Sequence, residues 1–314
     1  MRISIIGPGI MPIPPTGWGA VESLIWDYYQ ELTKNGHEVQ IVNTQNYQEI
    51  ASSVNEFNPD FVHLQYDDLY QVLDWINCPN KAATSHFGYL ENPQHLLGGY
   101  QRIFRGFVEG NFKIFCLSEG IANVYRQAGV PEERIFVTPN GARSDLFEFK
   151  KECEYKDRSI YLAKITDRKK QYLYQDIDFL DFAGNIDDHR FNVNRSNYLG
   201  EWTKDRLYKN LSNYSNLVLL SDGEAHPLVC CEALMCGLGL VISECSAANL
   251  DVNKPFITVI NNSDLNNIDL IKSEIIKNQE ISNLMREEIR QYGLDEFSWE
   301  SIVKKYVTVI ENII

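Results

Sequence analysis

The chain has 314 residues, about two domains at the usual ~100–200 residues per domain. Its fractions of hydrophobic residues, 44%, and charged residues, 23%, are those of an ordinary globular protein, which excludes a disordered chain. The 43 acidic residues outnumber the 29 basic residues and give a net charge of −14. So acidic a surface excludes broad binding to nucleic acid or to an anionic membrane face, although a local basic patch remains compatible with it.

The chain carries no run of about 18 apolar residues, the length that a membrane-spanning helix needs. Residues 1–7 contain one basic residue and a very short apolar run, which predicts a first strand rather than a signal peptide. The seven cysteines are scattered, and none forms a C-x-x-C pair, so neither a zinc site nor a disulfide framework is indicated. We interpret them as buried, reduced thiols of a cytoplasmic protein.

The first half of the chain alternates between strand and helix patterns. A strand pattern at residues 3–6 is followed by helical spacing over 21–32, and Asn35-Gly36 is a typical helix end. Further predicted strands are residues 39–42, 61–64, 81–84 and 113–117. Such alternation predicts a parallel sheet with helices on both faces.

A second α/β series follows a charged, aperiodic stretch at residues 150–157, which we interpret as a linker. Its predicted strands are residues 159–163, 179–184, 217–220 and 240–243. A last helix is predicted from Asp295 onward, with an apolar stripe formed by Trp299, Ile302, Val303, Tyr306 and Ile310. Two such series in tandem predict a cleft at the carboxyl ends of both sheets.

The first candidate site is Gly17-Trp18-Gly19, which runs into the helix that contains Glu22. Glycines allow a backbone to approach a ligand closely, and helix amino termini bind phosphate. A simple tight turn between strand and helix explains the pattern equally well. The earlier Gly7-Pro8-Gly9 lacks the third glycine of a nicotinamide-binding fingerprint, so we reject that interpretation.

The second candidate is the segment 221–228 with the helix that follows it. Pro227 is suited to a first helical turn, so Glu224 is expected in the loop before the helix and Glu232 inside it. An anion above the helix start would meet the N–H groups of Leu228 and its neighbour, while the two acids would suit sugar hydroxyls. The alternative is an acid that serves the helix dipole plus an unrelated internal glutamate.

The third candidate is a cluster of cations, Lys164 with Arg168-Lys169-Lys170, just after the first strand of the second series. In so acidic a chain this concentration of positive charge is unusual. A position at a strand end would direct it into the predicted cleft. The alternative is an ordinary solvated face.

Five segments in the right order resemble retaining glycosyltransferase family 4, whose members have the GT-B fold. They are Gly17 to Glu22, Phe115-Cys116-Leu117-Ser118-Glu119, Arg134 to Gly141, Glu224 to Gly237 with the family's E-x7-E spacing, and Phe297-Ser298-Trp299. The resemblance implies an α/β protein with two Rossmann-like domains facing across a cleft. It places an acceptor-side domain at residues 1–150, joined by a C-terminal helix at 296–314, and a donor domain at 151–295.

The resemblance also implies roles for individual residues. Gly17 and Gly19, together with Lys164, Arg168 and Lys169, would hold the donor diphosphate. Glu224 would face the transferred sugar and Glu232 would bind the nucleotide ribose. His86, in Thr84-Ser85-His86-Phe87-Gly88, would lie near the reacting centre. The backbone around His226, Pro227 and Leu228 would line the sugar-phosphate pocket, which makes Glu224, His86 and Lys169 the expected catalytic residues.

Three departures from the family pattern accompany these matches. Ala163-Lys164 replaces the usual Gly-Arg, Lys170 replaces a glycine, and Ala225-His226 replaces Gly-Phe. Lysine neutralises phosphate but lacks the two-pronged guanidinium of arginine. The chain is also shorter than the family norm between about Lys170 and Tyr198.

The expected function is that of a metal-independent, retaining glycosyltransferase of polysaccharide biosynthesis, located in the cytoplasm. It would use a nucleotide-diphosphate sugar as donor substrate, a glycan or glycoconjugate as acceptor, and no cofactor. Asp176-Ile177-Asp178 spells a D-x-D motif but precedes a predicted strand, so we do not assign it a metal. The alternatives are a non-catalytic nucleotide-sugar-binding subunit and a sugar-nucleotide epimerase; nucleic acid is not an expected partner, and peripheral membrane contact is not indicated.

Overall fold

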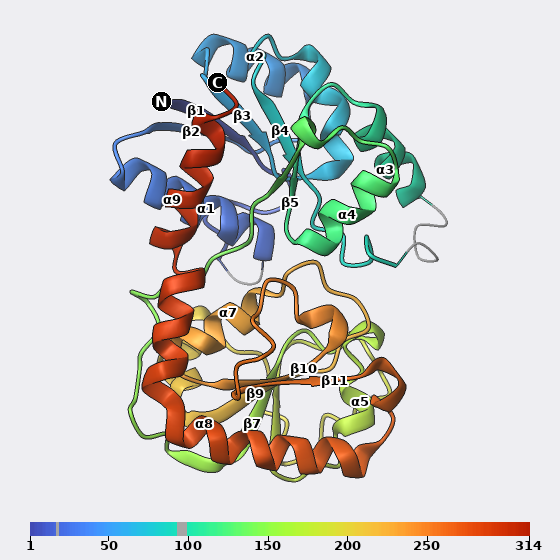
Figure 1. Cartoon of the computed structure of the whole chain (residues 1–314), viewed down its shortest axis with the longest axis vertical. Helices are drawn as coiled ribbons and strands as arrows, with labels where there is room; N and C mark the ends of the chain where they lie inside the picture. The colour runs from blue at the N-terminus through green and yellow to red at the C-terminus, as the bar shows by residue number, and fades with distance from the viewer. Residues whose placement is uncertain (17–18, 93–98) are drawn as a thin grey trace. The chain divides into compact units, whose positions relative to one another are not determined.

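The computed structural model describes residues 1–16, 19–92 and 99–314 (Figure 1). These residues form two compact units. Unit 1 comprises Met1–Gly141 and Trp299–Ile314, and unit 2 comprises Ala142–Ser298. Each unit is an α/β body with its own parallel sheet. This architecture confirms the predicted fold class.

Unit 1 contains a six-stranded sheet in the order β2-β1-β3-β4-β5-β6. Its strands are β1 (Arg2–Ile6), β2 (Glu38–Val42), β3 (Phe61–Leu64), β4 (Lys81–Thr84), β5 (Lys113–Cys116) and β6 (Ile135–Val137). Every pairing is parallel, and Ile5 lies between Ile41 and His63 in the register. Because helices cover both faces of a parallel sheet, its strands are runs of buried residues, as at Ile3, Ile5 and Ile6.

The helices of unit 1 are α1 (Ala20–Lys34), α2 (Tyr47–Phe57), α3 (Tyr100–Glu109), α4 (Glu119–Gln127) and α9 (Trp299–Glu311). Side chains cap two of them, because Asn46 accepts from the backbone at the start of α2 and Ser118 does so at the start of α4. The predicted end of α1 is confirmed, with Gly36 at a φ of 83°.

Helix α9 returns the end of the chain to unit 1, as predicted. Its apolar stripe is buried, and the ring of Tyr28 on α1 lies 4.7 Å from that of Trp299 and 4.8 Å from that of Tyr306. The predicted start of this helix at Asp295 is wrong, because residues 295–297 belong to the preceding helix. Ser298 has an extended backbone and separates the two helices. It forms a bridge with Ala142, the residue at which the chain first enters unit 2.

Unit 2 contains a five-stranded parallel sheet in the order β11-β10-β9-β7-β8. Its strands are β7 (Tyr155–Leu162), β8 (Leu180–Ala183), β9 (Tyr214–Leu219), β10 (Gly239–Ser243) and β11 (Ile257–Ile260). The four predicted strands are confirmed. The predicted linker at 150–157 is wrong at its end, since β7 already begins at Tyr155; these first strand residues are exposed and therefore lack the apolar pattern that would reveal them.

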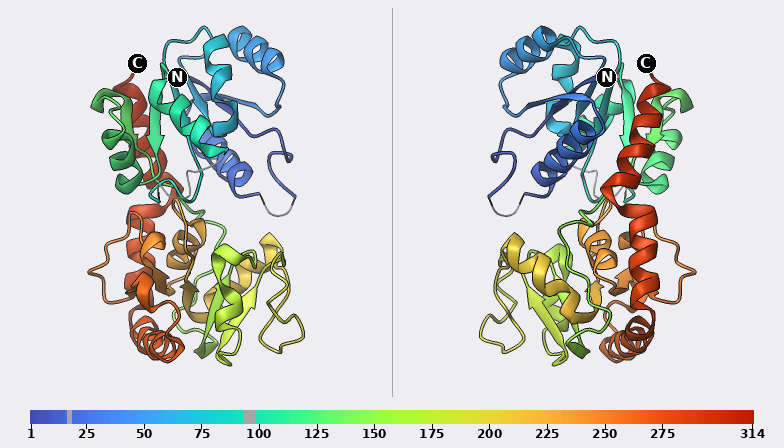
Figure 2. Two further views of the ribbon diagram at one scale, coloured as in Figure 1. Left: turned by 90° about the vertical axis from the view of Figure 1, so that its right-hand side faces the viewer. Right: turned by 90° about the vertical axis from the view of Figure 1, so that its left-hand side faces the viewer.

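The helices of unit 2 are α5 (Gln171–Tyr174), α6 (Lys204–Asn210), α7 (Leu228–Met235) and α8 (Ile268–Phe297). The connection between β7 and β8 thus contains only the single turn of α5 and the 3-10 turn before it. Helix α8 changes direction at Met285, whose φ of −115° and ψ of 16° are not helical (Figures 1 and 2).

Arg286, just after this change of direction, joins several segments of unit 2. Its side chain is 2% exposed. The guanidinium donates to four backbone carbonyl oxygens, those of Lys150, Ser212, Tyr214 and Cys236, at 2.8–3.0 Å. One side chain therefore supplies hydrogen-bond donors to carbonyls from four separate segments, at a position shielded from water.

We expect Arg286→Met to lower the free energy of unfolding by about 3 kcal/mol, because the substitution leaves buried carbonyl oxygens without donors. Urea denaturation measures this difference. Arg105→Met is the matched control, since Arg105 on α3 has a side chain 77% exposed and pairs with the exposed Glu109. An equal effect of both substitutions would contradict the structural role of Arg286.

Candidate functional site

The candidate site in unit 2 lies at the carboxyl edge of its sheet, where two neighbouring strands end. After β7 the chain passes Lys164 and makes a turn at Asp167–Lys169, where the side chain of Thr166 accepts a hydrogen bond from the backbone N–H of Lys169. After β9 it makes the loop that contains Glu224. The backbone N–H of Asp222 donates to the carbonyl of Arg168 at 3.0 Å, which joins the two loops.

Glu224 is the acidic centre of this site. Its side chain is 9% exposed, and Oε1 forms a hydrogen-bonded ion pair with Nζ of Lys169, whose own side chain is 11% exposed. Arg168 lies 3.1 Å from the same oxygen and donates to the carbonyl of Gly223. Burial by itself would raise the pKa of Glu224, but the charges of Lys169 and Arg168 outweigh burial and lower it.

The remaining predicted cations lie around this centre. Lys170 adopts a left-handed backbone with φ of 54° and pairs with Asp222 at 3.1 Å. Lys164 pairs instead with Asp187 at 3.1 Å, and both side chains are at least half exposed. The structure therefore brings Arg168, Lys169 and Glu224 into direct contact, whereas it engages Lys164 with a different acid.

The predicted helix start after Glu224 is present, with Pro227 as the residue before the first turn of α7. The first N–H groups of a helix, here those of Leu228 and Val229, have no acceptor within the helix. His226 contributes no charge to this end, because its buried ring lies 3.7 Å from Sγ of Cys231 and burial lowers its pKa to about 4. We therefore expect the backbone here, and not the histidine, to face an anion.

Glu232 lies inside α7, as predicted, and is half-buried. Burial raises the pKa of its carboxyl group, and the charge of Lys204 offsets part of that rise. No hydrogen bond or salt bridge joins this carboxylate to any residue within the described ranges. A half-buried carboxylate that lacks a partner among the described residues can accept hydrogen bonds from a ligand.

The predicted site residues of unit 1 are two glycines before α1 and a histidine after β4. Gly17 lies outside the described residues. Gly19 directly precedes α1 with a φ of 138°, and a Cβ atom there would lie 3.0 Å from Oε2 of Glu22, so this position requires glycine. His86 follows β4, and its Nε2 lies 2.9 Å from Oε1 of Gln65. Burial lowers the pKa of His86 to about 4, so its ring is neutral at physiological pH.

The grouping of potential ligand side chains and the place of the D-x-D motif bear on metal binding. Within the described ranges no three His, Cys, Asp or Glu side chains are grouped so as to hold a metal ion. The D-x-D acids are surface groups before β8, and Asp176 pairs with Arg195 at 2.5 Å while Asp178 lies 4.0 Å from it.

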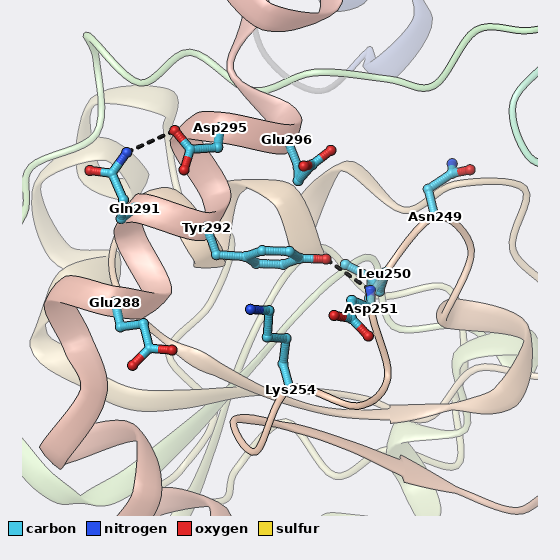
Figure 3. Close-up of a pocket in the computed structure, with 9 residues that line it drawn as sticks. All are labelled: Asn249, Leu250, Asp251, Lys254, Glu288, Gln291, Tyr292, Asp295 and Glu296. Carbon is cyan, nitrogen blue, oxygen red and sulfur yellow. Dashed lines mark hydrogen bonds between the residues drawn. The ribbon is translucent and has the colours of Figure 1, made fainter.

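A separate pocket in unit 2, of about 720 Å³, lies between the segment 249–254 and the second half of α8 (Figure 3). Tyr292 lies across it and accepts a hydrogen bond from the backbone of Asp251. The pocket is lined by four acids, Asp251, Glu288, Asp295 and Glu296, but by a single cation, Lys254. This excess of negative charge disfavours a diphosphate, and none of the predicted site residues lines it.

Sequence reasoning missed Gln65 and Asp187, and it included Asp222 in the segment 221–228 without giving it a role. Gln65 and Asp222 hold site residues in place through contacts between different loops. Gln65 follows β3 directly, so its position at a strand end was the one available signal. Nothing in the local pattern of the chain indicated which cation each acid would meet.

No protein-family model matches the chain, and no curated protein matches it by sequence. Its fold is nevertheless that of solved glycosyltransferase structures. HepE of Anabaena, in complex with UDP and glucose, aligns with a TM-score of 0.72 at 12% identity, over 99% of this chain and 100% of HepE. Sucrose-phosphate synthase of Thermosynechococcus elongatus aligns with a TM-score of 0.80 at 14% identity, over 99% and 98% of the two chains.

The lipopolysaccharide outer core galactosyltransferase WaaB, in its apo form, aligns over 99% of this chain and all of its own, with a TM-score of 0.68 at 12% identity. These likenesses establish the GT-B fold.

We expect Glu224→Gln to lower the free energy of unfolding by about 2 kcal/mol at pH 7.5, because the amide no longer neutralises the charge of the buried Lys169. Since the folded-state pKa of Glu224 is lowered, its contribution is fully present above the unfolded-state value and is lost as the pH falls through the folded-state value. Thermal unfolding followed from pH 7.5 downward should show a constant difference between the two proteins until the pH falls below the ordinary pKa of a glutamate, and a shrinking difference below it. A difference that is independent of pH would contradict the ion pair.

Proposed function

We propose that the chain is a retaining glycosyltransferase that moves a monosaccharide from a nucleotide-diphosphate sugar to a glycan or other hydroxyl acceptor, without a metal ion. The observation that carries this proposal is the concentration of Arg168, Lys169 and Lys170 at the carboxyl edge of unit 2, beside the start of α7. Three cations and the first N–H groups of a helix would provide a site for an anion in a protein of net charge −14.

The charges fit the bond that would break. When the bond between the anomeric carbon and the diphosphate lengthens, negative charge grows on phosphate oxygen and positive charge on the sugar. Lys169, Arg168 and the N–H groups of α7 would stabilise the departing anion. Glu224, kept ionised by its lowered pKa, would accept hydrogen bonds from the hydroxyls of the transferred sugar and favour its positive charge.

Retention of configuration follows if the acceptor attacks from the face that the diphosphate leaves. The acceptor oxygen forms the new bond to the anomeric carbon, the diphosphate takes the bonding electron pair, and a phosphate oxygen takes the acceptor's proton. This route requires no basic side chain on the opposite face of the sugar. It requires strong stabilisation of the diphosphate, which the cations of unit 2 are arranged to give.

Glu232 is proposed to bind the ribose of the donor. Its carboxylate lacks a partner among the described residues, and a pair of vicinal hydroxyls would satisfy both oxygens. The neighbouring structures that hold UDP and glucose or UDP-glucose make UDP-glucose the first donor to test. We further propose a cytoplasmic site of action, supported by the seven cysteines, all of which are free. Among helices in the described ranges, none has both the length and the apolar character needed to cross a membrane.

The test is hydrolysis or transfer from UDP-glucose and other nucleotide sugars, measured with purified protein and a mixed acceptor library. We expect Lys169→Ala to lower kcat/KM by about 100-fold or more, since it removes a buried charge that would stabilise the leaving group. Lys209→Ala is the matched control, because Lys209 in the same unit pairs with the exposed Asp205 on the surface of α6. Wild-type turnover by both Lys169→Ala and Glu224→Gln would contradict the site assignment.

One observation favours a second candidate, a non-catalytic subunit that binds nucleotide sugar. Lys164, which stands where the resemblance expects arginine, is engaged with Asp187 rather than directed to the Glu224 centre. A subunit of this kind would be stabilised thermally by the nucleotide sugar and would show no turnover with any acceptor. Turnover in the assay above would exclude it.

A further inference from the structure

The loops that follow β7 and β8 are joined by backbone hydrogen bonds beyond the ends of both strands. The N–H of Ile165 donates to the carbonyl of Asn185 at 2.8 Å, and the N–H of Asp187 donates back to the carbonyl of Ile165 at 2.9 Å. Gly184, with a φ of 155°, permits this close approach, because a Cβ atom there would overlap the carbonyl oxygen of Ala163. The backbone therefore fixes the position of Asp187 beside the loop after β7.

This backbone pairing places an acid next to one of the predicted phosphate-binding cations. Nζ of Lys164 donates a hydrogen bond to Oδ2 of Asp187 at 3.1 Å. The two side chains are 50% and 66% exposed, so water reaches both groups. An ion pair this exposed is weak, because solvation and side-chain entropy offset most of its attraction. Lys164 can therefore leave Asp187 at small cost when a ligand offers a stronger partner.

Lys164 differs in two ways from the other cations at this edge of the sheet. Among the four cations predicted from the sequence, its side chain is the most exposed. Its acid is also the one that lies on the loop after β8, whereas Glu224 and Asp222, the acids of the other three, lie on the loop after β9. Asp187 can therefore be replaced without removing an ion-pair partner from the Glu224 centre.

We propose that Asp187 is a competing carboxylate, which holds Lys164 in an ion pair that a bound diphosphate must open and thereby weakens the binding of that diphosphate. This inference rests on the proposed function and deepens it. When Lys164 turns to a phosphate, the carboxylate left beside it repels the anion. Asp187 is thus a positioning residue, because it acts on the ligand through Lys164.

The consequence concerns release of the product. Transfer of the sugar would leave a nucleoside diphosphate, which carries more negative charge than the donor because the sugar no longer covers a phosphate oxygen. The cations that stabilise the departing anion would therefore also retain it. A carboxylate that takes back Lys164 favours departure of the product, a step that limits kcat in many enzymes.

The inference is tested by calorimetric titration with UDP and with uridine, which has no phosphate, at low ionic strength. We expect Asp187→Asn to lower the Kd for UDP about threefold or more and to leave the Kd for uridine unchanged. Lys164→Met should raise the Kd for UDP, because it removes the cation itself. Added salt should reduce the difference between Asp187→Asn and the wild type, since exposed charges are screened.

Asp205→Asn is the matched control. It removes the same charge from unit 2, and Asp205 is likewise an exposed acid paired with a lysine, Lys209, on α6. We expect this variant to bind UDP with the Kd of the wild type. Equal tightening by Asp187→Asn and Asp205→Asn would show an effect of net charge alone and would overturn the inference.

The sign of the change separates the proposal from its opposite. A Kd for UDP that is unchanged in Asp187→Asn overturns the inference. A larger Kd overturns it as well, because Asp187 would then orient Lys164 toward the diphosphate rather than compete for it. A wild type that binds UDP but transfers no sugar contradicts the proposed transferase, while the titrations still decide the role of Asp187. A wild type that does not bind UDP or any other nucleoside diphosphate contradicts both.

Discussion

The parallel pairing of strands is the constraint on which the rest of this protein depends. A parallel strand can be followed by its neighbour only after the chain crosses back over a face of the sheet, so both faces become covered and every strand ends at the same edge. In unit 2 this places the turn after β7 beside the loop after β9, which are neighbouring strands in the sheet although about 55 residues separate Arg168 from Gly223. In unit 1 it places the residues after β3 beside those after β4.

Electrostatics then differs between the two edges. In unit 2 the edge holds charges that keep one another ionised, with Lys169 and Arg168 lowering the pKa of a buried Glu224. In unit 1 burial acts without an opposing charge and leaves His63 and His86 neutral. The first arrangement is suited to an anion that gains charge during a reaction. The second contributes no charge to the binding of an anion.

The Lys169–Glu224 ion pair differs from the ion pairs on the surface of this acidic chain. Many of its ion pairs, such as Arg105–Glu109 and Lys209–Asp205, lie on the exposed surface, where an ion pair contributes little to stability. The Lys169–Glu224 pair lies at the carboxyl edge of a sheet, and both side chains are largely shielded from water. Their charges therefore interact more strongly than those of a surface pair. A diphosphate that entered this edge would provide a second partner for Arg168 and Lys169.

The sequence by itself determined the class of fold and named the residues of the candidate site. The apolar runs of the strands and the apolar stripe of α9 follow from local periodicity, so both could be predicted. The exposed start of β7 could not be predicted, because it lacks an apolar pattern. The break between helices at Ser298 could not be predicted either, because it accompanies pairing with Ala142. Site residues such as Lys169 and Glu224 were named from motifs, but the residues that they contact could not be predicted. Only the tertiary structure decided that Lys169 and Arg168 share Glu224, that Lys164 meets Asp187, and that Gln65 contacts His86. The physical reason is that local pattern specifies which face a residue presents, whereas an ion pair or hydrogen bond between loops depends on how distant strands are brought into register.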